Sequence, residues 1–438
     1  MLFNVYSYLF LVDSTVKWGV LHWLQVQHFW WSVWFWERFV YVSKGESFLA
    51  AVGRHPYKVR GLFLIAIVGL SGAVVFGMHQ QQSAQEGEVL NEFYFGVSFG
   101  GQTAEEAKVL IDRVKGCTNF FLINSHDLAL DEDALNEVCD YAAQAGLKFT
   151  VYFEFISRVA YPWHQSWLDS APSRWNGSFL GVYFYDEPGG KQLDTQMMFS
   201  NAASYSDAAE RFVQNITQTN SMIDLKSRSI LTFTADYGLY WWDYLAGYDV
   251  VYAELGWQLN SIQQIALCRG AANMQNKTWG AIIVWTYYDP PYIGSAHAIY
   301  QEMILAYDAG AKYVVVFNHP TYPEDNPYGI LSEEHLSAME DFWNYTIATP
   351  QIIDSGEQAR SVLVLPSDYG WGMRRNKHHL EDTIWGLWAE DEKAPLILEN
   401  IGKLIELYGL DFDIVFDDAR FDINNTYSRV YFWNQTIL

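Results

Sequence analysis

The central part of this 438-residue chain is predicted to fold as a (β/α)8 barrel. Eight short stretches rich in β-branched and aromatic residues alternate with stretches whose apolar residues recur at helical spacing. Strands that alternate with helices form a parallel sheet, and eight such units are enough to close it into a barrel. A doubly wound open sheet is the alternative, because closure depends on contacts that a linear pattern does not contain.

The eight predicted strands lie between residues 90 and 345, which we take as the barrel domain. In chain order they span residues 93–99, 120–124, 149–155, 180–185, 230–235, 250–253, 279–286 and 313–317. The helical stretches between them include residues 103–114, 134–145, 202–215, 261–274 and 297–309. The repeated order of strand and helix is the basis of the barrel prediction.

Polar and acidic residues follow almost every one of these strands. In a (β/α)8 barrel the carboxyl ends of the strands meet at one face, where active sites are assembled. A barrel with only a structural role needs few carboxylates there, because their repulsion raises pKa values and lowers stability. Each residue alone is as well explained as a helix cap or ion-pair partner, and it is the set that predicts a site. Its members are His126, Glu154, Tyr185, Asp186, Glu187, Asp236, Glu254, Trp257, Trp285, Tyr287, Tyr288, Asp289 and His319.

The chemistry that this set favours is hydrolysis of a glycosidic bond. The sequence has no HExxH, GxSxG, phosphate-binding or dinucleotide-binding motif, so we expect neither a metal nor a cofactor. Carboxylates and aromatic residues remain. Glycosidic cleavage requires one carboxylic acid that protonates the leaving oxygen and one carboxylate that attacks or activates water. The expected partner is therefore a carbohydrate substrate.

The stretch 181–190, GVYFYDEPGG, is the strongest single motif. Its β-forming residues lead into two carboxylates, a proline and two glycines, which end a buried strand. It resembles the fourth strand of the clan A glycoside hydrolases, which ends in Asn-Glu-Pro; the resemblance makes Glu187 the acid/base, with Asp186 in place of the asparagine. The pair is also similar to that of β-N-acetylhexosaminidases, in which the aspartate orients the substrate's acetamido group and the glutamate is the acid.

The resemblance also implies a second carboxylate close to Glu187. Clan A enzymes carry their nucleophile after the seventh strand, where this chain has Asp289, and Glu254 on the sixth strand is the other candidate. A nucleophile is expected about 5 Å from the carboxyl of Glu187, whereas about 6.5 to 9.5 Å indicates inversion. If Asp186 orients an acetamido group, one of the tyrosines before Asp289 is expected to hold that group's oxygen. As the acid, Glu187 must be protonated near the working pH, while Asp186 stays ionised.

The composition narrows the possible partners. The formal net charge is −24 with only 18% charged residues, so the surface repels nucleic acid and no nucleic-acid partner is expected. The alternative to an enzyme is a catalytically inactive barrel that binds glycans or supports the cell envelope, because a fold does not guarantee activity.

The three cysteines, Cys117, Cys139 and Cys268, have no metal-ligand spacing; the first two are a candidate disulfide, and three separate buried thiols are the alternative.

Residues 1–85 are predicted to anchor the chain in a membrane. Residues 61–78 form an uncharged apolar run of about the length that crosses a bilayer as a helix. Basic residues precede this run and acidic residues follow it, so the positive-inside rule puts the barrel outside the cytoplasm, at the cell surface. Residues 18–36 are predicted to form a second, less hydrophobic span or a helix that lies in the membrane interface. For residues 61–78, a cleaved signal peptide is the competing interpretation. Six Asn-X-Ser/Thr sequons agree with an extracytoplasmic glycoprotein; they begin at Asn176, Asn215, Asn276, Asn344, Asn424 and Asn434.

A second, smaller domain is predicted at residues 360–438. Its strand candidates are 361–366, 412–416 and 430–433, with a helix at 394–407. This order predicts a small flavodoxin-like α/β domain, although a glycine-rich phosphate loop is missing. The arrangement resembles the domain that follows the barrel in some β-galactosidases. Residues 370–388 are both polar and aromatic and are predicted to form a long surface excursion.

Overall fold

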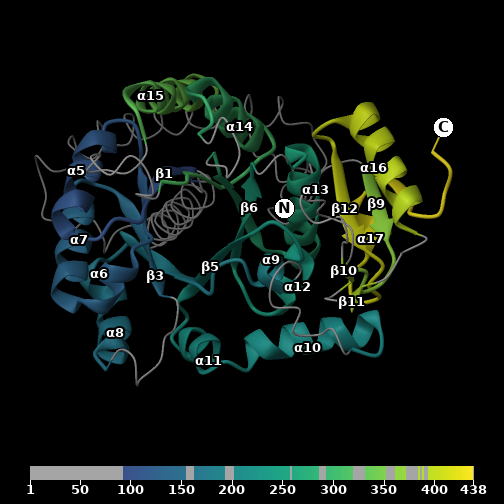
Figure 1. Ribbon diagram of the computed structural model, residues 1–438, viewed down its shortest axis with the longest axis horizontal. Helices are drawn as coiled ribbons and strands as arrows, with labels where there is room; N and C mark the ends of the chain where they lie inside the picture. The colour runs from purple at the N-terminus through teal and green to yellow at the C-terminus, as the bar shows by residue number, and fades with distance from the viewer. Residues whose placement is uncertain are drawn as a thin grey trace, which may run out of the picture. The chain divides into compact units, whose positions relative to one another are not determined.

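The computed structural model describes residues 92–153, 162–192, 202–256, 259–285, 293–318, 331–351, 361–370, 383–384, 387–388 and 393–437. All of them belong to one compact unit, Asn91–Leu438. Its centre is a closed barrel whose eight parallel strands pair in chain order, from β1 (Tyr94–Phe99) to β8 (Tyr313–Val316) (Figure 1). The predicted (β/α)8 barrel is confirmed. The open-sheet alternative is wrong, because β1 and β8 pair with each other.

The remaining barrel strands lie close to their predicted positions. They are β2 (Phe120–Ile123), β3 (Lys148–Phe153), β4 (Phe179–Phe184), β5 (Leu231–Asp236), β6 (Val250–Leu255) and β7 (Thr278–Ile283). Two differences bear on the site. Strand β6 extends far enough to include Glu254, and β7 ends before Trp285.

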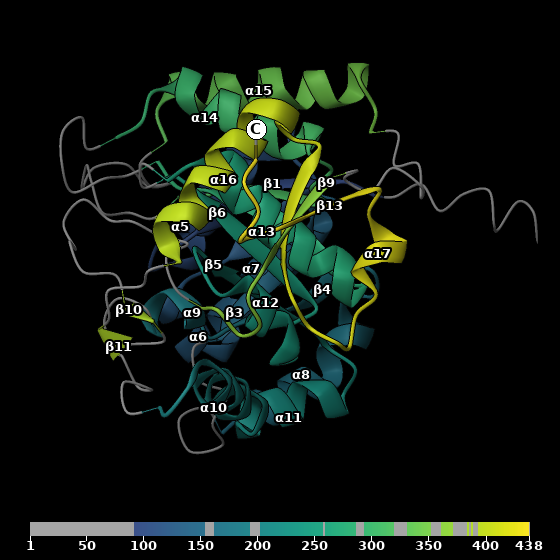
Figure 2. The same cartoon turned by 90° about the vertical axis from the view of Figure 1, so that its right-hand side faces the viewer.

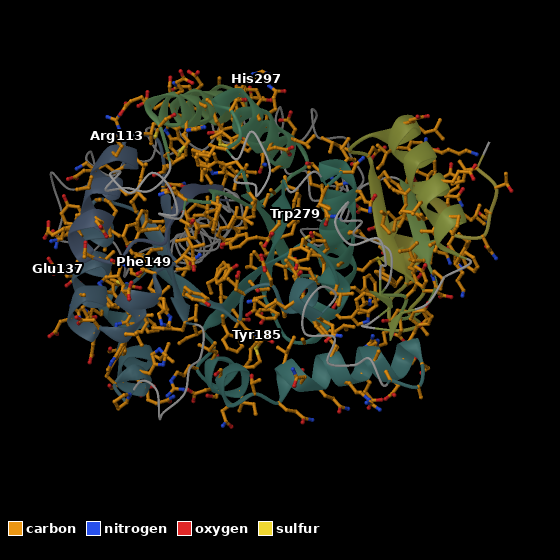
Figure 3. The ribbon with its side chains drawn as sticks, viewed as in Figure 1. Arg113, Glu137, Phe149, Tyr185, Trp279 and His297 are labelled. Atoms are coloured by element: carbon orange, nitrogen blue, oxygen red, sulfur yellow. The ribbon has the colours of Figure 1, made fainter. Side chains whose placement is uncertain are left out.

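Helices cover the outside of the barrel, and most of them begin at a Ser, Thr, Asp or Asn whose side chain accepts a hydrogen bond from the first turn. Their exposed faces carry polar residues such as Arg113, Glu137 and His297, whereas Phe149 and Trp279 lie on the strands (Figure 3). They are α5 (Ala104–Val114), α6 (His126–Leu130), α7 (Glu132–Gln144), α8 (His164–Arg174), α9 (Pro188–Lys191), α10 (Tyr205–Thr217), α11 (Asn220–Ser227), α12 (Tyr240–Leu245), α13 (Ser261–Gln275), α14 (Ala296–Asp308) and α15 (Glu333–Ala348).

Side chains that alternate along the strands divide into an inner and an outer layer. Successive residues of a strand point to opposite faces of the sheet, so one set fills the barrel and the other packs under the helices. The inner set is rich in aromatic rings: Tyr94, Phe120, Leu122, Tyr183, Phe233, Ala235, Val250, Tyr252, Ile282, Val284, Tyr313 and Val315. A residue near the end of a strand therefore reaches the mouth of the barrel only if it shares this inward alternation.

A smaller parallel sheet packs on the outside of α13. Its central strand is β9 (Ser361–Leu365), with β12 (Phe412–Phe416) and β13 (Arg429–Phe432) on either side. Figures 1 and 2 show it in yellow, together with α16 (Ala394–Tyr408) and α17 (Ile423–Thr426). A short antiparallel pair, β10 (Thr383–Ile384) and β11 (Leu387–Trp388), lies in the predicted excursion. The expected order of strands and helix is present, and the flavodoxin-like assignment stays a prediction.

A buried ion pair joins this sheet to the barrel. The guanidinium of Arg269 on α13 donates to Asp413 Oδ1 over 2.8 Å and to the backbone oxygen of Phe412 over 3.0 Å. Beside it, a Cβ on Gly270 would lie 2.5 Å from the backbone oxygen of Ile414, so α13 and β12 approach too closely for a side chain. The barrel and the sheet share one hydrophobic core.

Both predicted membrane segments, residues 61–78 and 18–36, lie outside the described residues. Within the described ranges, none of the helices combines the length and the apolar character that crossing a bilayer requires. The three cysteines are all buried and unpaired, so the candidate disulfide between Cys117 and Cys139 is absent and the alternative of three separate thiols is what the structure shows.

Candidate active site

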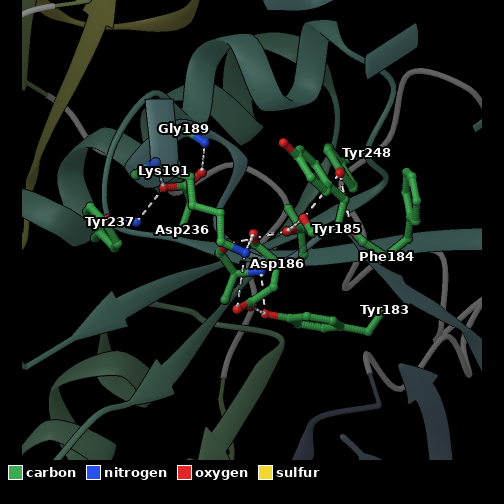
Figure 4. Close-up of polar contacts among 12 residues, drawn as sticks. Tyr183, Phe184, Tyr185, Asp186, Gly189, Lys191, Asp236, Tyr237 and Tyr248 are labelled. Carbon is green, nitrogen blue, oxygen red and sulfur yellow. Dashed lines mark hydrogen bonds and ion pairs between the residues drawn. The ribbon is translucent and has the colours of Figure 1, made fainter. Parts of the chain in front are cut away.

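The loop that follows β4 carries the strongest sequence motif. Tyr185 and Glu187 both have left-handed backbone conformations, with φ of 51° and 49°, which are uncommon for residues with a side chain. Helix α9 then starts at Pro188, whose fixed φ suits the first turn of a helix. Asp186 lies between the two left-handed residues, just beyond the carboxyl end of β4 (Figure 4).

Asp186 is held from two sides. The hydroxyl of Tyr183, a residue of the inner layer, donates to Asp186 Oδ1 and accepts from the backbone N–H of Ala235 over 3.0 Å. The ammonium of Lys191 lies 3.9 Å from Asp186 Oδ2 and donates to the Asp186 backbone oxygen over 2.5 Å. A hydroxyl donor and a cation both favour the ionised form of a carboxylate.

Glu254 lies next to Glu187, near the end of β6. It is two residues beyond Tyr252, which belongs to the inner layer, so its side chain points toward the mouth of the barrel. Only 4% of Glu254 is exposed. A hydrogen bond joins the carboxyls of Glu254 and Glu187, and the pKa of Glu254 is raised well above its usual value, first by burial and then by the charges of Glu187 and Asp186. Burial and these charges favour the protonated form of Glu254.

Asp236, the last residue of β5, binds the turn after Glu187. Its carboxylate is completely buried and accepts the backbone N–H groups of Gly189 over 2.6 Å, Gly190 over 2.8 Å and Tyr237 over 2.7 Å (Figure 4). Burial raises the pKa of Asp236 to about 7, although these hydrogen bonds act in the opposite direction. Asp236 was expected to bind substrate; the structure places it beneath the turn, bonded to backbone amides and without surface that a substrate can reach.

Asp243 on α12 adds a second buried carboxyl beside Asp236. Burial, followed by the charge of Asp236, raises the pKa of Asp243 well above its usual value. Among the described residues, neither oxygen of its carboxyl has a hydrogen-bond partner. Burial and the charge of Asp236 both favour the neutral form of Asp243, whereas Asp236 accepts hydrogen bonds from the backbone.

The remaining predicted residues in the described part of the chain lie at different depths. Tyr185 is half-buried and its ring faces the ammonium of Lys191 at 5.8 Å. His126 is exposed at the start of α6. Trp285 was expected to contact substrate, but it is 1% exposed and its indole N–H donates to the backbone oxygen of Phe317 over 2.6 Å. Trp285 follows the inward-facing Val284, so its side chain packs under the helices rather than in the mouth.

Six predicted residues fall outside the described part of the chain: Glu154, Trp257, Tyr287, Tyr288, Asp289 and His319. Their assignment to the site stays a prediction. Within the residues that the structure does describe, no group of three or more His, Cys, Asp or Glu side chains is arranged to hold a metal ion.

Three residues of this region were not predicted from the sequence: Tyr183, Tyr237 and Asp243. The role of Tyr183 could have been inferred from the sequence. Side chains alternate along β4, so Tyr183 points into the barrel, and its hydroxyl reaches Asp186 three residues later. The ring of Tyr237 is buried against Gly190. Tyr237 and Asp243 had no local signal, since their roles depend on the packing of α9 against β5 and α12.

Comparisons with known proteins support no assignment beyond the fold. No protein family model and no curated protein sequence matches the chain. Solved structures similar to it include the catalytic module of a family 98 glycoside hydrolase from Streptococcus pneumoniae, at 12% identity and a TM-score of 0.47, covering 79% of this chain and 66% of that one.

An endo-β-1,4-mannanase from Thermotoga petrophila is similar at 8% identity and a TM-score of 0.40, covering 61% of this chain and 79% of that one. A 3-deoxy-D-arabino-heptulosonate 7-phosphate synthase from Thermotoga maritima is similar at 9% identity and a TM-score of 0.35, covering 58% and 87%. Glycoside hydrolases are thus among the structures with a similar barrel. Likenesses of this size carry no argument about activity, and the barrel itself rests on the strand pairing.

Proposed function

We propose that this protein is a glycoside hydrolase that cleaves O-glycosidic bonds of a polysaccharide or glycan by carboxylate acid/base catalysis. The observation that carries the proposal is the hydrogen-bonded pair of Glu187 and Glu254 at the carboxyl end of a closed parallel barrel. Burial favours the protonated form of Glu254, and glycosidic hydrolysis requires one protonated and one ionised carboxyl.

Burial favours Glu254 as the acid of the pair, with Glu187 as the nucleophile or base. The expectation from the sequence, with Glu187 as the acid, is the opposite assignment. A series of aryl glycosides decides between them. Loss of the acid slows substrates with poor leaving groups far more than those with good leaving groups, whereas loss of the nucleophile or base slows both.

The activity test is a screen of released reducing ends over a glycan panel, followed by the variants Glu187→Gln and Glu254→Gln on the best substrate. Each is expected to lower turnover by roughly 10²- to 10⁴-fold while the fold is retained. Glu210→Gln, at an exposed position on α10, is the control and is expected to match the parent. Parent-like turnover in either pair variant contradicts the proposal, and binding of glycans without hydrolysis supports the inactive alternative.

The closeness of the pair favours retention of configuration. The two carboxyls are close enough to interact directly, which is nearer to the retaining than to the inverting arrangement. Inversion requires a water in a gap of roughly 6.5–9.5 Å, whereas retaining enzymes have carboxyls about 5–5.5 Å apart. NMR of the first sugar released is expected to show the anomer of the substrate. Release of the opposite anomer contradicts this assignment.

We further propose that the barrel lies outside the cytoplasm, tethered to the membrane by residues 61–78. The basic flank of that run supports this orientation. All six sequon asparagines are exposed, so each is accessible to a glycosylating enzyme. Protease added to intact cells is expected to digest the barrel, and enzymatic deglycosylation is expected to increase its gel mobility. Protection until the cells are lysed contradicts the topology.

A further inference from the structure

Asp236 is a buried carboxylate that the proposed chemistry does not use. It follows Ala235, a residue of the inner layer, so it points away from the barrel interior and toward α9 and α12. Besides Gly189, Gly190 and Tyr237, it accepts the backbone N–H of Gly238 over 3.2 Å. A carboxylate that is fully buried and bonded to four backbone amides on two loops connects those loops.

The loop that Asp236 binds is a strained one. The left-handed conformations of Tyr185 and Glu187 are unfavourable for residues with a side chain, and such conformations persist only where the surroundings hold them. Thr234 on β5 donates to the backbone oxygen of Tyr185 over 3.0 Å, and Tyr248 donates to that of Phe184 over 3.1 Å. These contacts hold the start of the loop, and the hydrogen bonds from Gly189 and Gly190 to Asp236 hold its end.

The end of the loop packs closely against Asp236 and Tyr237. A Cβ on Gly189 would lie 2.7 Å from Asp236 Oδ2, and a Cβ on Gly190 would lie 2.0 Å from Cζ of Tyr237. Neither glycine has a positive φ, so the reason for glycine at both positions is close approach and not backbone conformation. The turn can be bound by Asp236 only because it lacks side chains.

We propose that Asp236 is the positioning residue of the candidate active site: its carboxylate seats the turn at Gly189 and Gly190 and thereby holds Glu187 against Glu254. The inference rests on the proposed function and adds to it a residue that touches neither substrate nor the reacting atoms. Glu187 immediately precedes α9, its backbone N–H donates to Ala235 over 3.1 Å, and its backbone oxygen accepts from Lys191 over 2.9 Å. A shift of α9 therefore moves Glu187 directly.

Asp243 supports this role by remaining neutral. If the carboxyls of Asp236 and Asp243 were both ionised, their repulsion would displace Asp236 from the backbone amides that it binds. Neither oxygen of Asp243 has a hydrogen-bond partner, so the hydrogen-bonding capacity of Asp236 is used by the backbone amides. The groups whose charges act on Asp236 from neighbouring elements are Glu187 on the β4 loop, Glu254 on β6 and Asp243 on α12.

The test is Asp236→Asn, measured by hydrogen exchange and by kinetics. An amide has one acceptor oxygen and turns its NH2 toward the backbone donors, so at least one of the two glycine amides loses its partner. Exchange in peptides covering residues 181–192 is expected to accelerate by at least about tenfold, because the turn opens locally. Turnover is expected to fall about 100-fold with little change in KM, since misplacement by about 1 Å has an effect of that size.

Asp249→Asn is the matched control. Asp249 accepts the backbone N–H of Thr232 over 3.0 Å, but it lies at the amino end of β6, at the opposite end of the barrel from the site. It is expected to lower stability without changing exchange in residues 181–192 or the turnover. Gly190→Ala is the second variant. It leaves Asp236 intact and displaces the turn through contact with Tyr237, and the same kinetic loss is expected.

Faster exchange with unchanged turnover in Asp236→Asn overturns the positioning role while the proposed function stands. Unchanged exchange overturns it as well. If the parent protein hydrolyses no glycan, the proposed function fails separately, and a crystal structure of Asp236→Asn then decides the inference. A Glu187 carboxyl that still bonds Glu254 in that variant overturns it, and a displaced Glu187 supports it.

Discussion

Replacing Glu254 with glutamine is expected to stabilise the protein near neutral pH while removing activity. Glu254 is buried beside Glu187, and its pKa is raised well above the usual value of 4.5. In the folded protein it keeps its proton, whereas in the unfolded chain it is ionised near pH 7. An acid with a raised folded-state pKa contributes its full stability below its unfolded pKa and loses it as the pH rises toward the folded value.

The size of the effect follows from that linkage. The stability of the parent falls by up to about 1.4 kcal/mol for each pH unit above 4.5 until the folded-state pKa of Glu254 is reached. Glutamine has no proton to lose, and its amide donates the same hydrogen bond to Glu187. At an unfolding entropy of about 2.1 cal/mol/K per residue, each 1.4 kcal/mol corresponds to roughly a 2 °C rise in Tm for a unit of this size.

The assay is thermal unfolding of the parent and of Glu254→Gln between pH 4.5 and 8, with Glu210→Gln as the exposed control. The gain in Tm is expected to be near zero at pH 4.5 and to grow as the pH rises, while Glu210→Gln follows the parent throughout. Equal Tm values at neutral pH, or parallel pH profiles, would refute the conclusion that Glu254 is held protonated. A site residue whose loss stabilises the fold is the expected pattern for a group kept for function.

Three further outcomes follow from buried groups. Arg269→Met leaves Asp413 buried without its cation and is expected to lower the free energy of unfolding by about 3–5 kcal/mol in urea; an unchanged midpoint contradicts the ion pair. Tyr183→Phe removes the donor to Asp186 and leaves the backbone N–H of Ala235 without its acceptor. The free energy of unfolding is expected to fall by about 1–3 kcal/mol in the same assay, and parent-like stability contradicts these two hydrogen bonds. Burial is the main cause of the raised pKa of each of the three free thiols. They are expected to resist a thiol reagent until the chain unfolds and then to react at three sites. Fast labelling of the native protein, or fewer than three sites after unfolding, contradicts this.

The sequence was sufficient to locate the eight barrel strands, because apolar runs and the turn and capping residues that bound them are local features. It also located Asp186, Glu187 and Glu254 as polar groups at strand ends. All three lie together in the structure, because the strands are parallel and their carboxyl ends share one face. The membrane anchor and the flavodoxin-like assignment remain predictions from the same kind of local pattern.

The predictions for Asp236 and Trp285 show the limit of that reasoning. Side chains alternate with a period of two, so a shift of one residue in a strand end moves a side chain from the mouth of the barrel to the layer under the helices. Both residues follow an inward-facing neighbour, Ala235 and Val284, and both are buried outside the barrel interior. Strand ends read from sequence are not accurate to one residue, so the facing of such positions is decided by the register of the closed sheet.

By itself, then, the sequence determined the order of the eight strands and the helices between them, and the carboxylates at the ends of β4 and β6. Closure, shown by the pairing of β1 with β8, and the seating of the β4 loop on Asp236 were decided only by tertiary structure. So was the location of the proton. A carboxyl keeps its proton when burial removes water and a neighbouring charge repels its ionised form, and both depend on distances between residues far apart in the chain, such as Glu187 and Glu254.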